Sequence, residues 1–157
     1  MRIALDTMVL AYAEGVDGPE RQAQTMTVLS CFIEADIVLP TQTIGELYNV
    51  LTRKNRLPTA QARRRLAGWI EGYRLHPAGE GVFVAALALA ADKGLQFWDA
   101  LILATAADAG CLLLLSEDFQ DGFVWRGVTV ANPYAASPHP LLAALLEAAR
   151  SRKDPPL

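Results

Sequence analysis

The segment FWDALILATAADAGCLLLLSED, residues 97–118, indicates the class of fold. Trp98 to Ala109 has the composition of a buried helix, and Gly110 follows it where glycine commonly ends helices. Leu112 to Ser116 is then a predicted strand whose leucines show no alternation with polar residues. Strands that are apolar on both faces are typical of parallel sheets covered by helices on both sides. The segment therefore predicts an α/β fold.

The same alternation of strand and helix continues along the rest of the chain. Further short β-type runs are Ile3 to Asp6, Ile37 to Pro40 and Val128 to Pro133. Apolar residues with helical spacing lie between them, at Met26, Leu29, Phe32 and Ile33, at Ile44, Leu47, Tyr48 and Leu51, at Leu66, Trp69, Ile70 and Tyr73, and across Glu80 to Lys93. We therefore predict a three-layer α/β/α architecture with a central parallel sheet, in which the first strand is central.

Length and composition indicate one main domain. The chain has 157 residues, of which 52% are hydrophobic, so it is long enough to bury a core. We expect residues 1–134 to form this domain. Residues 135–157 are expected to be a C-terminal extension with a short amphipathic helix from Leu141 to Arg150 and a frayed end from Ser151 onward.

The longest apolar stretches are too short to cross a membrane. Val82 to Ala91 and Ala100 to Ala107 are about half of the roughly 20 residues that a span needs, so both are expected to be buried helices. The amino terminus has no pattern of a signal peptide, and a cytoplasmic protein is therefore expected. Cys31 and Cys111 lack metal-ligand spacing and are expected to be core thiols.

Four acidic residues stand where an α/β sheet would gather them. Asp6 closes the first strand, Asp118 follows the fourth, Glu46 lies one helical turn after the second, and Asp99 opens a helix. Ligands of open parallel sheets collect outside the carboxyl ends of the strands. Taken singly, each acid has an ordinary explanation: an N-cap for Asp6 and Asp99, a turn for Asp118, and a solvated helix face for Glu46.

The joint placement of the four acids predicts a metal site. Carboxylates that lie close together repel one another, and a hard divalent cation with oxygen ligands relieves that repulsion. Mg²⁺ or Mn²⁺ is the expected ion. Such an ion can polarise a phosphodiester, lower the pKa of a bound water and stabilise a leaving oxygen.

The sequence around these acids resembles the four acidic motifs of PIN-domain proteins of the VapC toxin kind. The motifs are Ile3 to Thr7, Gly45 to Lys54, Phe97 to Ala104 and Leu115 to Gly122, and the resemblance covers about residues 1–134. It implies an endoribonuclease that depends on Mg²⁺ or Mn²⁺ and cleaves RNA. It also implies a homodimer, which a cognate antitoxin inhibits by covering the acidic pocket.

The resemblance also assigns the site residues by position. Asp6, Glu46, Asp99 and Asp118 match the metal-binding acids, and Ser116 stands where the family often has threonine. Thr7 and Asn49 are expected to support them, and Glu117 is a reserve candidate whose side chain should point elsewhere if it continues the strand. The family usually has asparagine two positions after the first aspartate, where this chain has Met8; Asn49 is a possible substitute.

One segment beside the predicted site is locally basic, although the formal net charge of the chain is −3. It includes Arg53, Lys54, Arg63, Arg64 and Arg65. These side chains are candidates for steering RNA phosphates toward the acids, and the alternative is a solvated helix face with no ligand.

Two other functions remain open from the sequence. A phosphatase with Asp6 as nucleophile would generally need a second acid two residues later, and Met8 cannot serve as one. A catalytically quiet PIN-like domain that only binds a protein or RNA is the main alternative to the nuclease. Measuring Mn²⁺-dependent cleavage of single-stranded RNA separates the two.

Overall fold

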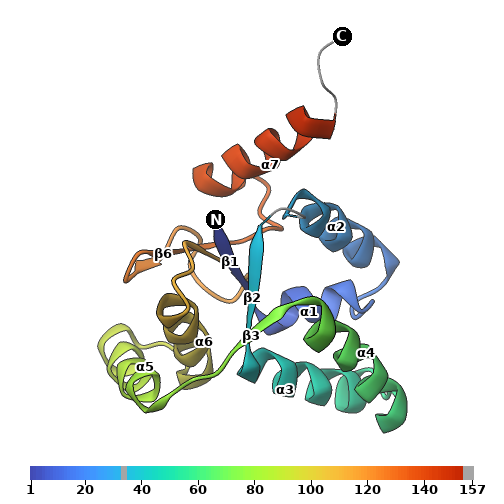
Figure 1. The fold of residues 1–157 in the computed structure, drawn as a ribbon, viewed down its shortest axis with the longest axis horizontal. Helices are drawn as coiled ribbons and strands as arrows, with labels where there is room; N and C mark the ends of the chain where they lie inside the picture. The colour runs from blue at the N-terminus through green and yellow to red at the C-terminus, as the bar shows by residue number, and fades with distance from the viewer. Residues whose placement is uncertain (33–34, 154–157) are drawn as a thin grey trace.

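A computed structural model of the chain describes residues 1–32 and 35–153, with side chains up to residue 151, and Figure 1 shows the arrangement of its elements. In chain order they are β1 (Arg2–Leu5), α1 (Thr7–Ala13), α2 (Pro19–Leu29), the 3₁₀ turn η1 (Ser30–Phe32), β2 (Asp36–Pro40), α3 (Thr41–Asn49), the π-helical turn η2 (Val50–Lys54), α4 (Thr59–Gly72), β3 (Arg74–His76), α5 (Glu80–Lys93), α6 (Phe97–Asp108), β4 (Leu113–Leu115), β5 (Val124–Trp125), β6 (Val128–Ala131) and α7 (Pro140–Lys153).

The strands form one mixed sheet in the order β3-β2-β1-β4-β6-β5. β1 pairs in parallel with β2 and with β4, and β3 and β6 extend the parallel part on either side. The first strand is therefore interior, as predicted. The prediction of a parallel sheet is confirmed for five strands, whereas the two-residue β5 pairs antiparallel with β6 at one edge.

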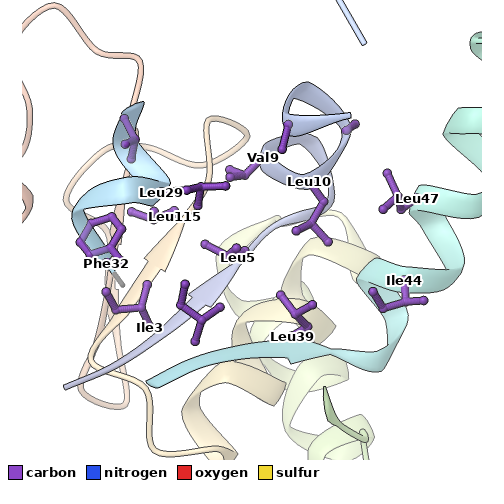
Figure 2. Close-up of a cluster of buried hydrophobic side chains, with 14 of the residues drawn as sticks. Ile3, Leu5, Val9, Leu10, Leu29, Phe32, Leu39, Ile44, Leu47 and Leu115 are labelled. Atoms are coloured by element: carbon purple, nitrogen blue, oxygen red, sulfur yellow. The ribbon is translucent and has the colours of Figure 1, made fainter. Parts of the chain in front are cut away.

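Alternate residues of the strands build two separate cores, one on each face of the sheet. Ile3, Leu5 and Leu39 belong to the first core, together with residues of α1, α2 and α3, some of which Figure 2 shows, and of α4. Ala4 and Val38 point to the second core, which α5 and α6 cover on the opposite face (Figure 1). All five side chains are buried, and together the two cores make the three-layer architecture that the apolar strands predicted.

The C-terminal helix α7 packs on the first core. Leu142 is fully buried there, and Ala149, seven residues later on the same face of the helix, is also buried. The helix extends past the predicted end at Arg150 to Lys153. The domain boundary at residue 134 stays a prediction, and residues 154–157 of the tail lie outside the described part of the chain, as does Ile33 of the helical run predicted from Met26.

Most helix predictions agree closely with the structure. α5 has the predicted bounds, and Gly110 follows the C-cap of α6 with a φ of 70°, a left-handed conformation that glycine adopts without steric cost. Cys111 is buried as expected, but Cys31 is only half-buried because it lies in the exposed turn after α2. Among the described helices, none combines the length and apolar character needed to cross a bilayer.

Candidate active site

A pocket of about 300 Å³ lies beyond the carboxyl ends of β1 and β4. Its walls come from four separate segments: the start of α1, the middle of α3, the start of α6 and the loop after β4. All four predicted acids line it. The lining residues are Asp6, Thr7, Met8, Glu46, Asn49, Val50, Gln96, Asp99 and Asp118.

Asp6 is the most deeply buried of the four acids, with 2% of its surface exposed. Its backbone N–H continues the pairing of β1 with β4 by donating to the carbonyl of Leu115. Its Oδ1 accepts from the backbone N–H of Thr7 at 2.6 Å, and its Oδ2 accepts from the hydroxyl of Ser116. Asp6 therefore caps α1, as its ordinary explanation required, and also belongs to the pocket.

Glu46 is held by two donors. Thr7 Oγ1 donates to its Oε2 at 2.5 Å, and Gln42 Nε2 donates to its Oε1 at 2.7 Å. Thr7 thus joins Asp6 through its backbone and Glu46 through its side chain. Gln42 was not predicted, although it stands four residues before Glu46, the spacing that places two side chains on one face of a helix. The interpretation of Glu46 as part of a freely solvated helix face is wrong.

Asp99 is the third residue of α6. The N-cap of this helix is Gln96, and no side chain makes a capping hydrogen bond there. The ordinary explanation of Asp99 as an N-cap therefore does not hold, because the helix begins at Phe97, three residues before the position that a cap at Asp99 would require. Its carboxylate lines the pocket instead, near the positive end of the helix dipole.

The loop after β4 orders the remaining polar groups. Ser116 is buried, and its Oγ accepts from the backbone N–H of Asp118 at 3.1 Å while its hydroxyl donates to Asp6. Ser116 therefore fixes two of the four acids at once. Glu117 accepts a hydrogen bond from the hydroxyl of Tyr12 and is not among the pocket residues, as expected for a side chain on the other side of the strand.

The acids raise one another's pKa. Burial is the main cause of the raised pKa of Asp6, about 7, with repulsion from Asp118 and Asp99 added and the hydrogen bonds from Ser116 and Thr7 opposing it. Burial likewise raises the pKa of Asp99 to about 6, helped by the charges of Asp118 and Glu46. These mutual effects mean that the carboxylates interact electrostatically within one pocket.

Asp118 shows the same pattern with one difference. Burial raises its pKa most, the charges of Glu117 and Glu46 raise it further, and the charge of Lys54 lowers it. Lys54 ends η2, so this predicted basic residue lies near enough to the pocket to act on one of its acids.

The donor set fits a hard divalent cation such as Mg²⁺ or Mn²⁺, because every acidic group in the pocket offers oxygen. In the described residues, no three His, Cys, Asp or Glu side chains are already drawn together as a metal cluster. Hydrogen bonds to both oxygens of Asp6 and to both oxygens of Glu46 fix the orientation of these two carboxylates.

The predicted supporting and basic residues divide into several places. Met8 and Asn49 both line the acid pocket, so an amide side chain is present there from α3, and its role in place of the family's asparagine stays a prediction. Arg63 and Arg64 line a separate cleft. Arg65 is bound elsewhere, with its Nη1 3.0 Å from a carboxylate oxygen of Glu14.

Replacing Thr7 by valine should weaken metal binding. The change keeps the shape of the side chain and removes the hydroxyl that holds Glu46, and loss of such an outer-shell partner typically costs about 10-fold to 100-fold in metal affinity. Titration calorimetry with Mn²⁺ measures the effect. Thr27→Val is the matched control, because the hydroxyl of Thr27 is exposed and contacts only the backbone of its own helix. Equal Mn²⁺ affinity in the two variants would show that Thr7 does not position Glu46 for an ion.

Comparison with known proteins agrees with this geometry. The family model of the PIN domain matches residues 3–121. No curated protein matches the sequence. The solved toxin VapC20 from Mycobacterium tuberculosis, described as cleaving the sarcin-ricin loop, has 19% identity and a TM-score of 0.62, and the alignment covers 81% of this chain and 98% of that one.

Two further solved structures have the same fold. A toxin–antitoxin complex from Klebsiella pneumoniae has 19% identity and a TM-score of 0.62, with 84% of this chain and 98% of that chain covered. FitAcB from Neisseria gonorrhoeae has 21% identity and a TM-score of 0.57 over the same shares of the two chains. The family match spans most of the sequence and includes all four acids that line the pocket, and the chain therefore belongs to the PIN-domain family.

Proposed function

We propose that this chain is a Mg²⁺- or Mn²⁺-dependent endoribonuclease and the toxin of a toxin–antitoxin pair that acts in the cytoplasm. The observation that carries the proposal is the gathering of Asp6, Glu46, Asp99 and Asp118, from four segments of the chain, around one pocket. The solved VapC20 toxin, which shares the fold, supports RNA as the substrate class.

The residues of the pocket have separable roles in this proposal. Bound to the carboxylates, the ion would supply positive charge that activates a water and balances the charge developing on the phosphate. Thr7 and Ser116 hold Glu46 and Asp6 in fixed orientations through the hydrogen bonds already described. Met8 and Val50 give the pocket an apolar wall, which strengthens electrostatic interactions beside it.

Cleavage of single-stranded RNA in Mn²⁺, in Mg²⁺ and in EDTA tests the proposal. The parent protein should cleave only with a divalent ion. Asp6→Asn should lose cleavage while keeping the cap of α1, because its side-chain oxygen still accepts from the Thr7 N–H. Asp92→Asn removes the same charge from an exposed position on α5 and should cleave like the parent. Metal-independent cleavage would contradict the mechanism, and absence of cleavage with retained RNA or protein binding would favour the catalytically quiet alternative.

We also propose an antitoxin partner and a homodimer. The solved toxin–antitoxin complex supports the first. Exposed apolar side chains support contact surfaces: Met26, Tyr48 and Ile70 lie on α2, α3 and α4. A second group, Phe83, Val84, Leu87 and Trp98, lies on α5 and the start of α6.

If the α5 group forms the dimer contact, Leu87→Glu should convert the dimer to a monomer at micromolar concentration. Leu87 is 58% exposed, so a charge there harms an interface much more than the fold. Sedimentation equilibrium measures the mass. Leu112→Glu is the matched control, because Leu112 is 52% exposed at a different place. If the dimer persists in Leu87→Glu and dissociates in Leu112→Glu, the interface includes Leu112 and lies away from α5.

A further inference from the structure

A second cleft, larger than the acid pocket, lies between α3 and the beginning of α4. Its volume is about 540 Å³, within the range of roughly 300–1,000 Å³ that small-ligand sites occupy. The lining residues are Tyr48, Thr59, Ala60, Arg63 and Arg64. The proposed chemistry of the acid pocket uses none of them.

The arginines of this cleft have their charges available. Within the described part of the chain, neither Arg63 nor Arg64 takes part in an ion pair, whereas the adjacent Arg65 is bound to Glu14. The surrounding segment, residues 47–70, contains six lysines and arginines and no aspartate or glutamate. The cleft is therefore a locally positive place on a protein of net charge −3, which favours an anionic ligand.

Tyr48 offers the ligand a second kind of contact, besides the charges of the two arginines. Its side chain is 36% exposed and forms part of the cleft wall together with the two arginines. An aromatic ring offers a stacking surface to any nucleobase, and a guanidinium can bind a phosphate through two parallel hydrogen bonds. The carboxylates of an acidic peptide would bind only the two arginines. A nucleotide would bind the arginines through its phosphate and the ring of Tyr48 through its base.

The cleft and the acid pocket lie beside the same helical segment. Tyr48 lines the cleft, and the next two residues, Asn49 and Val50, line the acid pocket. Successive residues of a helix point about 100° apart, so the two sites lie on different sides of one helix whose diameter is about 10 Å. Lys54, at the end of the same segment, acts electrostatically on Asp118. Basic side chains therefore lie both near the acid pocket and in the cleft.

We propose that this cleft binds a nucleotide of single-stranded RNA that flanks the cleaved bond, with its base on Tyr48 and its phosphate on Arg63 and Arg64. The inference rests on the proposed ribonuclease function and adds a subsite to it. RNA bound at the acid pocket reaches the cleft around the C-terminal end of α3. Single-stranded RNA is recognised by stacking of unpaired bases on aromatic side chains, which fits this arrangement.

Fluorescence anisotropy of a fluorescein-labelled single-stranded RNA, in EDTA and at several salt concentrations, tests the subsite apart from the chemistry. Tyr48→Leu should weaken binding about tenfold, and Tyr48→Phe should retain it because the ring remains. Arg63→Ala and Arg64→Ala should each weaken binding most at low salt and lower the salt slope by about one. Lys93→Ala, an exposed charge on α5, is the matched control and should bind like the parent.

The outcomes separate this inference from the proposed function. Cleavage by the parent together with unchanged RNA affinity in the Tyr48 and arginine variants would overturn the subsite and leave the nuclease standing. RNA binding that depends on Tyr48, without cleavage by the parent, would support the subsite and contradict the nuclease. Binding of a polyglutamate peptide with the same dependence on Tyr48 would also overturn the subsite as a nucleotide site. Circular dichroism confirms that each variant is folded.

Discussion

Between pH 5 and pH 8, the metal-free protein should lose about 3 kcal/mol of its free energy of unfolding because of Asp6 alone. Burial raises the pKa of Asp6 from its usual value of 3.8 to about 7. A raised pKa in the folded state means that the folded protein binds more protons than the unfolded chain between these values. The stabilising contribution is complete below pH 3.8 and is lost as the pH rises through about 7.

Chemical denaturation at a series of pH values in EDTA measures this loss. Asp6→Asn removes the titrating group while its oxygen still caps α1, so most of the decrease toward pH 8 should disappear in the variant. Asp92→Asn, at an exposed position on α5, should keep the parental pH profile. A parent whose stability is constant over this range, or rises with pH, would contradict the burial of an ionising Asp6 in a repulsive pocket.

The strands that matter for the site could be predicted from the sequence because they are almost entirely apolar and buried. In β1 only Arg2, its first residue, is polar and partly exposed, β4 is buried throughout, and each strand is followed by an acid within a few residues. β3 and β5 were missed for the opposite reason. Each lies at a sheet edge and is short: β3 is Arg74–His76 and is only partly buried, and β5 has two residues. Edge strands need little apolar sequence, so periodicity gives no signal for them.

The four acids that line the pocket and two of their partners, Thr7 and Ser116, could be predicted, but the partner Gln42 could not. The placement of acids at strand ends and helix starts follows from α/β topology alone. Gln42 stands in an ordinary helical position, and only the folded structure shows that it donates to Glu46. The exact first residue of α6 was also beyond the sequence, because the helix begins at Phe97 with Gln96 as its N-cap and no side-chain capping bond.

Three adjacent arginines also show that long-range partners of a side chain cannot be predicted from the sequence. The sequence treats Arg63, Arg64 and Arg65 alike, as one basic run. In the helix, successive side chains point in different directions, and Arg65 meets Glu14 from the end of α1, which is distant in sequence. Such a long-range ion pair leaves no local pattern. The prediction of an RNA-steering role is therefore carried forward for Arg63 and Arg64, whose cleft is open, and not for Arg65.

Asp99→Asn should separate the stability of the metal-free protein from that of the metal-bound protein. The substitution is nearly isosteric, and it removes one charge from a pocket where Asp118 and Glu46 already raise the pKa of Asp99. Without metal, the variant should therefore be as stable as the parent or slightly more stable, because there is less repulsion. The α6 helix should be unaffected, since Asp99 makes no capping hydrogen bond.

With saturating Mn²⁺ the order should reverse. An ion that binds only the folded state stabilises it by about 2.7 kcal/mol at 100 times its dissociation constant. The parent should gain this increment, and the variant should gain much less because it lacks one ligand oxygen with full charge. RNA cleavage should fall with the metal-induced shift, since a poorly held ion neither activates water nor balances charge on the phosphate.

Thermal unfolding with and without Mn²⁺, alongside RNA cleavage, measures both effects in the same preparations. Asp92→Asn is again the control, because it removes the same charge from the exposed face of α5 and should match the parent in every measurement. If Asp99→Asn keeps the parental Mn²⁺-induced increase in stability and the parental cleavage, Asp99 lines the pocket without taking part in metal binding or catalysis. The site would then be reduced to Asp6, Glu46 and Asp118, of which Asp6 and Glu46 are each held by hydrogen bonds from two donors.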